Sequence, residues 1–130
     1  MLSGSCHCGS LRWTFAGDPG SVTACNCTIC RRYGALWIYG WEHEGVTTDG
    51  QSSVYSRGTF IGFHFCPACG CLAFYRALNP NEDGRRKVAA NLRMVDDPGA
   101  VATLPINHFD GLDRFDDLPR DGRCVADMWF

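Results

Sequence analysis

Nine cysteines in a chain of 130 residues constrain the fold more than any other feature of this sequence. All but Cys124 fall into three short clusters, which read Cys6-His7-Cys8, Cys25-Asn26-Cys27-Thr28-Ile29-Cys30 and Cys66-Pro67-Ala68-Cys69-Gly70-Cys71. Closely spaced cysteines form disulfides in oxidising compartments, but they bind metals or react as thiols in reducing ones. The compartment therefore decides what these clusters do.

The N-terminal residues MLSGSCHCGSLRW contain no basic stretch followed by an apolar run, and no part of the sequence is apolar for long enough to span a bilayer. We therefore expect a cytoplasmic protein with no membrane partner, in which the cysteines stay reduced. The formal charge is −2 and the basic residues are mostly scattered, which argues against a nucleic-acid partner.

The distribution of apolar residues predicts a mainly β domain that spans residues 1–130. Leu11, Trp13 and Phe15 alternate with polar residues, as in a half-buried strand. Strands are expected at 11–15, 22–25, 35–41, 53–57, 60–65, 72–76 and 88–92. Short helical turns are expected at 28–33, after an N-cap at Asn26 or Thr28, and at 98–103, after Asp96-Asp97.

The Cys66-Pro67-Ala68-Cys69-Gly70 segment has the spacing of a zinc knuckle, in which two sulfurs face one ion and the glycine closes the turn. A closed tetrahedral site needs about four ligands, so this pair requires a second pair. Cys6 and Cys8 are the obvious donors. The alternative is that all four are buried thiols without a metal.

Cys25, Cys27 and Cys30 then form a group with no obvious fourth ligand. Zinc sites with an open position are usually catalytic, and a thiol that binds there loses its proton. The same sequence also permits a second closed site completed by Cys71, Cys124 or a histidine, or a redox-active pair. A rubredoxin-like iron site would use the same four sulfurs as the closed zinc site.

The three segments GSCHCG, CNCTICRR and FCPACG resemble the family of glutathione-dependent formaldehyde-activating enzymes and centromere protein V relatives. The resemblance covers nearly the whole chain and implies a complex β fold of the Mss4-like type with two zinc ions. It assigns the structural zinc to Cys6, Cys8, Cys66 and Cys69, and the catalytic zinc to Cys25, Cys27 and Cys30. It also implies a carbon–sulfur lyase that condenses a thiol such as glutathione with formaldehyde.

Asn26 stands where the family triplet usually reads Cys-His-Cys. Its amide can donate a hydrogen bond to a ligand sulfur or to the substrate, but it cannot act as a general base as histidine does. Arg31 and Arg32 follow the triplet directly, and a guanidinium there could pair with the carboxylates of a thiol cofactor. The alternative for both arginines is an ordinary solvated pair.

Trp37, Tyr39 and Trp41 alternate on one strand face and belong either to a pocket above the open metal or to the core. His108-Phe109-Asp110-Gly111 is typical of a turn, and the terminal Trp129-Phe130 is expected to pack within the chain or at a dimer interface. A monomer and a homodimer are both compatible with the sequence. The main alternatives to an enzyme are a zinc-stabilised scaffold and a thiol redox or metal sensor.

Overall fold

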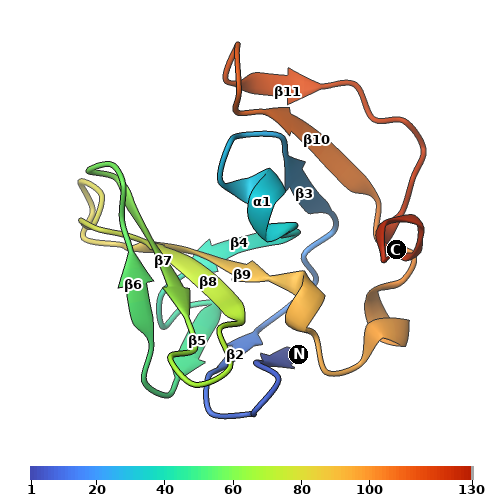
Figure 1. Ribbon diagram of the computed structural model, residues 1–130. Coiled ribbons are helices and arrows are strands. Elements are labelled where there is room, and N and C mark those ends of the chain that lie inside the picture. The colour runs from blue at the N-terminus through green and yellow to red at the C-terminus, as the bar shows by residue number, and fades with distance from the viewer. Residues whose placement is uncertain (130) are drawn as a thin grey trace.

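The computed structural model of the protein describes residues 1–129 and consists mainly of β-strands (Figure 1). The strands are β1 (Leu2–Ser5), β2 (Arg12–Phe15), β3 (Val22–Cys25), β4 (Trp37–Trp41), β5 (Val46–Asp49), β6 (Ser53–Tyr55), β7 (Ile61–Phe65), β8 (Leu72–Ala77), β9 (Lys87–Asn91), β10 (Ile106–Asp110) and β11 (Asp116–Leu118). The helices are α1 (Cys30–Tyr33) and the 3₁₀ turns η1 (Leu92–Met94), η2 (Pro98–Val101) and η3 (Val125–Met128).

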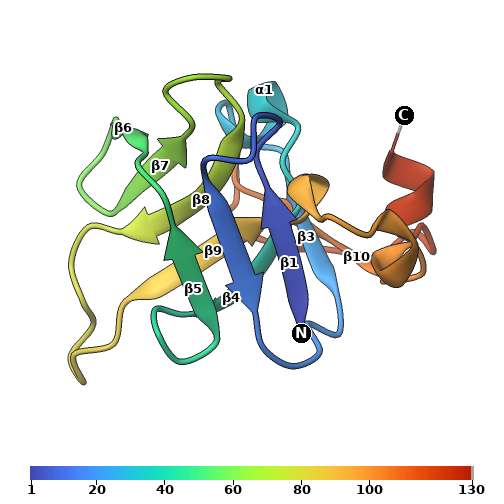
Figure 2. The ribbon, with the colours of Figure 1, turned by 90° about the horizontal axis from the view of Figure 1, so that it is seen from below.

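The strands form two sheets. A three-stranded sheet has the order β1-β2-β5, and an eight-stranded sheet has the order β11-β10-β3-β4-β9-β8-β7-β6. Strand pairs are antiparallel except for β10 and β3, which run in parallel. Figure 2 shows the small sheet lying across the middle of the large one, where β2 contacts β8 and β5 contacts β9.

One face of the large sheet packs against the small sheet. Ile38 of β4, Phe74 of β8 and Val88 of β9 are buried there, in one apolar cluster with Trp13 and Phe15 of β2. Successive side chains of a strand point to opposite faces, so the alternation along each strand decides which residues enter this core. The expected alternation of Leu11, Trp13 and Phe15 is confirmed, since all are buried.

The opposite face of the large sheet carries a second apolar cluster. It contains Phe63 together with Trp37 and Ala89, whose neighbours in sequence, Ile38 and Val88, belong to the first cluster. Helix α1 contacts β3, and Cys30 at its start belongs to this second cluster. In Figure 1, α1 lies between the β10–β11 hairpin and the strands β6 and β7.

The expected mainly β fold with few short helices is confirmed. Each strand expected from the sequence is present, with ends within a residue or two of the predicted ones. The strands β1, β5, β10 and β11 were not expected. Their sequences, LSGS, VTTD, INHFD and DDL, are too polar to show a strand pattern. These segments are strands because they form backbone hydrogen bonds with neighbouring strands.

The expected N-cap of the first helical turn is wrong. The N-cap is Ile29, with no side-chain hydrogen bond, because Asn26 and Thr28 lie in the loop that precedes the helix. The second helical turn is capped as expected, since the Asp97 side chain accepts a hydrogen bond from the amide of Gly99.

At the C-terminal end, Trp129 packs against the first apolar cluster, in agreement with an aromatic tail that packs within the chain. Phe130, the other residue of that expectation, lies outside the described residues. Among the helices of residues 1–129, none is sufficiently long and apolar to cross a membrane.

Gly4 of β1 offers a direct test of the packing between β1 and β2. A Cβ atom at Gly4 would lie 2.4 Å from the ring of Trp13, which is buried and cannot move away. We expect Gly4→Ala to lower the free energy of unfolding by about 1 to 3 kcal/mol, as is usual for overpacking. Urea denaturation measures this change.

Gly58→Ala is the matched control, because a Cβ at Gly58 meets nothing within 4 Å. It should unfold at nearly the same urea concentration as the parent chain. If Gly4→Ala does the same, the close contact between Gly4 and Trp13 does not contribute to stability.

Candidate active site

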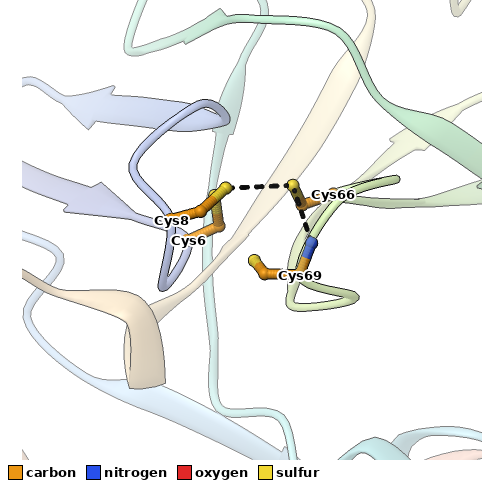
Figure 3. A group of neighbouring side chains, drawn as sticks. All are labelled: Cys6, Cys8, Cys66 and Cys69. Carbon is orange, nitrogen blue, oxygen red and sulfur yellow. Dashed lines mark hydrogen bonds between the residues drawn. The ribbon is translucent and has the colours of Figure 1, made fainter.

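Four thiols from two distant turns come together in the structure, as the sequence predicted. Cys6 and Cys8 follow β1, Cys66 and Cys69 follow β7, and their sulfurs all lie within 4.8 Å of one another (Figure 3). The Sγ atoms of Cys6 and Cys8 are 3.6 Å apart, as are those of Cys8 and Cys66. We call these four residues the quartet. Their arrangement could hold a metal ion.

Both turns of the quartet close in the same way. The amide of Gly9 donates to the carbonyl of Cys6 at 2.9 Å, and the amide of Gly70 donates to that of Cys66 at 2.8 Å. Both glycines have positive φ, at 81° and 79°, where a residue with a Cβ atom would be strained. This explains why a glycine follows each pair of cysteines.

Hydrogen bonds favour the thiolate form of Cys66. The Ser10 hydroxyl lies 3.3 Å from its sulfur and the Cys69 amide donates to it at 3.5 Å. These two bonds lower the pKa of Cys66 to about 5, well below the ordinary value of a thiol. A cysteine must be deprotonated to bind a metal, so the turn prepares this sulfur for ligation.

The second group, Cys25, Cys27 and Cys30, also assembles as predicted, and we call it the triplet. Cys25 ends β3, Cys27 lies in the following turn and Cys30 begins α1, and their sulfurs lie within 4.8 Å of one another. The amide of Cys30 donates to the Cys27 sulfur at 3.3 Å, and the indole Nε1 of Trp37 donates to the Cys30 sulfur at 3.4 Å. These bonds orient the sulfurs without occupying the space between them.

The three thiols of the triplet differ in acidity. A hydrogen bond from Cys30 lowers the pKa of Cys25 to about 6, although partial burial opposes the shift. Donating that bond raises the pKa of Cys30, and burial raises it further. One thiolate is therefore available near neutral pH before any cation is bound.

Within residues 1–129 the triplet has no fourth cysteine, histidine or carboxylate at a ligand distance. Cys71 instead packs beside the quartet, in the first apolar cluster. Cys124 donates to the carboxylate of Asp127 at 3.4 Å. The group that the structure assembles thus has three members, and neither of these cysteines completes it.

The triplet opens onto a cavity of about 1140 Å³. All three cysteines line it, and most of its remaining wall is aromatic, formed by Tyr33, Trp37, Tyr39, Tyr55, Phe63, Tyr75, Phe109 and Phe115. Of the three residues expected either in a pocket or in the core, Trp37 and Tyr39 line the cavity. Trp41 does not line it, and its ring lies beneath the guanidinium of Arg85, 4.2 Å from the ring centre.

Of the two arginines after the triplet, Arg32 lines the cavity and Arg31 does not. The Nη1 atom of Arg32 donates to the Thr28 carbonyl at 2.7 Å, which holds the side chain beside the triplet loop. Arg31 is exposed. A further cation, Arg57 in the loop after β6, lines the cavity and was not identified from the sequence.

The Asn26 side chain bonds to the β10–β11 turn, not to a ligand sulfur as the sequence suggested. Its Nδ2 donates to the Asp110 carboxylate at 3.2 Å, and its Oδ1 accepts from the Leu112 amide at 3.0 Å. Asn26 is not among the residues that line the cavity. It therefore joins the triplet loop to the turn that closes one side of it.

Asp110, the last residue of β10, and Gly111, the first residue of the turn, were not expected at the site. The Asp110 carboxylate also accepts from the Asp113 and Arg114 amides, and the Asp113 bond is the main cause that lowers its pKa. A Cβ at Gly111 would lie 2.6 Å from the Cys25 sulfur and 3.0 Å from the Cys27 Cβ. The turn expected at His108-Phe109-Asp110-Gly111 is wrong for its first three residues, which belong to β10, and the turn begins at Gly111.

This chain is similar to known proteins in sequence and in fold. Residues 1–108 match the family model described as glutathione-dependent formaldehyde-activating enzyme. A protein of Halomonas elongata, whose name assigns it provisionally as such an enzyme, is 30% identical, and the match covers 53% of this chain and 52% of that protein. The chain thus spans about half the length of this curated relative.

A solved structure of a Rhodobacter sphaeroides protein shares the fold. It matches with a TM-score of 0.60 at 20% identity, and the match covers 80% of this chain and 98% of that one. The likeness concerns the arrangement of the strands.

Gly111→Ala should disturb the triplet and leave the quartet intact. The added Cβ would push against the Cys25 sulfur, and a sulfur held by a metal cannot rotate away. We expect the triplet to bind cobalt(II) about tenfold or more weakly, measured from the visible absorption of thiolate-bound cobalt. Gly45→Ala is the control, since its Cβ meets only the Trp41 amide at 3.9 Å. Equal affinities in the two variants would contradict the close approach of Gly111.

Asn26→Asp should loosen the β10–β11 turn. The substitution places a second carboxylate 3.2 Å from Asp110 and removes the donor that bridges them. We expect the midpoint of thermal unfolding at neutral pH to fall by several degrees. Asn79→Asp adds the same charge at an exposed position and should leave the midpoint nearly unchanged. A similar small effect in both variants would show that the Asn26 bridge is dispensable.

Proposed function

Because this chain belongs to the family of glutathione-dependent formaldehyde-activating enzymes, we propose that it is a zinc-dependent carbon–sulfur lyase. It joins a thiol such as glutathione to a small aldehyde such as formaldehyde and also cleaves the adduct. The observation that carries this proposal is the triplet, a group of three thiols that lines a large cavity and, within residues 1–129, has no fourth ligand.

Zinc suits both groups of thiols. Four Zn–S bonds of about 2.3 Å in a tetrahedron separate the sulfurs by roughly 3.8 Å. The closest sulfurs of the quartet are 3.6 Å apart, and every pair lies within 4.8 Å in both groups. We propose a structural zinc held by Cys6, Cys8, Cys66 and Cys69, and a catalytic zinc held by Cys25, Cys27 and Cys30. Such free thiols persist in a reducing compartment, for which we propose the cytoplasm.

Zinc bound at the triplet supplies a Lewis acid that lowers the pKa of a thiol coordinated at its open position. The chain orients the three ligands through the Trp37 indole and the amide bonds at their sulfurs. In the net reaction a C–S bond forms at the aldehyde carbon and the π bond of the carbonyl breaks. The proton lost by the thiol ends on the carbonyl oxygen.

An arginine beside the triplet is proposed to bind the thiol cofactor. Arg32 lines the cavity beside the triplet, and Arg31 precedes it on α1. A guanidinium can pair with a carboxylate through two parallel hydrogen bonds, so we propose that Arg32 is the one of the two that receives a carboxylate of glutathione. Asn26 acts through the β10–β11 turn as a positioning residue, because both polar ends of its amide are engaged there.

Cys27→Ser tests the catalytic metal. We expect elemental analysis to find two zinc ions per chain in the parent protein and one in the variant. The enzyme-dependent rate at which ¹³C-formaldehyde and glutathione exchange with S-hydroxymethylglutathione, measured by NMR, should fall by about a thousandfold or more in the variant. The loss of one ligand from a three-ligand site explains both effects.

Cys124→Ser is the matched control, because Cys124 belongs to neither group of thiols. It should keep both zinc ions and the full exchange rate. One zinc ion in the parent protein, unaffected by Cys27→Ser and by glutathione, would contradict the proposal and would leave a scaffold stabilised by the quartet. Reversible loss of zinc on oxidation, without any exchange activity, would instead indicate a sensor.

A further inference from the structure

The cavity next to the triplet contains more aromatic surface than a one-carbon aldehyde can contact. Along the large sheet, Tyr39 pairs with Ala89, Ala89 with Tyr75, Tyr75 with Phe63 and Phe63 with Tyr55. Residues that pair directly lie on the same face, so this register places the rings in one row across five strands. The only small member of the row, Ala89, lies between Tyr39 and Tyr75.

The rings of this row touch one another at distances typical of aromatic packing. The ring centres of Phe63 and Tyr75 are 5.8 Å apart, and those of Tyr39 and Tyr75 are 6.3 Å apart. Trp37 meets Tyr75 edge to face at 4.9 Å, and its indole also reaches the Cys30 sulfur. Trp37 therefore connects the row to the triplet. We call the rings of the row, together with Trp37, the aromatic wall.

A second pair of rings lines the cavity on the other side of the triplet, because β10 and β4 flank β3 in the sheet. Phe109 lies beside Cys25, because β10 pairs with β3 in a register that aligns the two residues. Phe115 packs edge to face on Phe109 at 5.0 Å, and yet 78% of its surface is exposed. Phe115 also has a positive φ of 53°, a strained conformation for a bulky residue. An exposed and strained phenylalanine at the side of an aromatic cavity indicates a site that holds a ligand.

From these observations we propose that the physiological substrate pair of this enzyme includes a compound with an aromatic ring, which binds between the aromatic wall and Phe109 and Phe115. This inference rests on the proposed function and specifies its substrate class. Formaldehyde, with a single carbon, could contact only a small part of these rings. Glutathione carries charged and amide groups, and burying such groups against apolar rings is unfavourable in free energy.

Among the rings of the aromatic wall, Tyr39 is covered by the ammonium of Lys87, 4.6 Å from the ring centre. The two cations that line the cavity, Arg32 and Arg57, lie on α1 and in the loop after β6. Both can receive carboxylates, whereas the wall itself presents rings of β4, β6, β7 and β8. The ring can belong to the aldehyde or to the thiol. In either case the thiol sulfur bonds to the carbonyl carbon, the π bond breaks, and the thiol proton moves to the carbonyl oxygen.

Two arms of a kinetic experiment separate these sources. One arm pairs glutathione with 4-nitrobenzaldehyde, the other pairs benzyl mercaptan with formaldehyde, and glutathione with formaldehyde is the reference. Rates of adduct exchange above those without enzyme are measured by NMR. We expect one aromatic arm to exceed the reference in kcat/KM by about tenfold, since ring contacts contribute to binding in both ground and transition states.

Phe63→Leu removes a ring of the wall while the position stays apolar. It should reduce the preference of the enzyme for the aromatic pair over the reference by about three- to tenfold. Phe60→Leu is the matched control at an exposed phenylalanine that does not line the cavity, and it should keep the preference. Equal preferences in both variants would overturn the proposed contact with Phe63.

A binding measurement on the unmodified protein does not depend on any variant. Benzyl alcohol, which has the ring but no reactive carbonyl, is titrated into ¹⁵N-labelled protein loaded with zinc. We expect it to shift the indole signal of Trp37 and not that of Trp13, which is buried on the other side of the sheet. No shift at Trp37 and no aromatic preference, with formaldehyde exchange intact, would overturn this inference alone. A shift at Trp37 without exchange for any pair would support the aromatic site and overturn the proposed function.

Discussion

The alternation of side chains across the eight-stranded sheet is the constraint on which the rest of this structure depends. Ile38, Val88 and Phe74 point to the face that packs on the small sheet, whereas Trp37 and Ala89, their neighbours in sequence on β4 and β9, point to the triplet and its cavity. Every strand of the central part thus contributes both to the core and to the site. A shift of one residue in register would exchange the two faces, so the packing that stabilises the fold also fixes the site.

The quartet joins the two sheets at one end. Cys6 belongs to the turn after β1 of the small sheet and Cys66 to the turn after β7 of the large one, and both are buried in the first apolar cluster. A chain of this size buries a modest fraction of its surface, so a metal held by these thiols would add a cross-link where apolar packing alone is limited. The triplet occupies the opposite face, which leaves its sulfurs accessible from the cavity.

The conformation of the triplet also depends on residues more than eighty positions away in the sequence. Parallel pairing of β10 with β3 brings Asp110 and Gly111 to Cys25. Asn26 then bridges the two segments, with its amide held by Asp110 and Leu112. A polar residue between two cysteines here positions a turn, and the absence of a side chain at Gly111 leaves room for the sulfur of Cys25. The accessibility of the three sulfurs is therefore a property of two segments together.

The sequence by itself determined which thiols group together, because the spacing within a cluster and the glycine after it are local features that one turn satisfies. It also determined most strands of the large sheet, whose apolar alternation is strong, but it left open whether Trp37 and Tyr39 face a pocket or the core. Only the tertiary structure decided the polar strands β1, β5, β10 and β11, the role of Asn26, the place of Arg32 rather than Arg31 in the cavity, and the aromatic wall. The physical reason is that these features arise from backbone pairing and register between distant strands, which leave no periodic signal in the residues that take part.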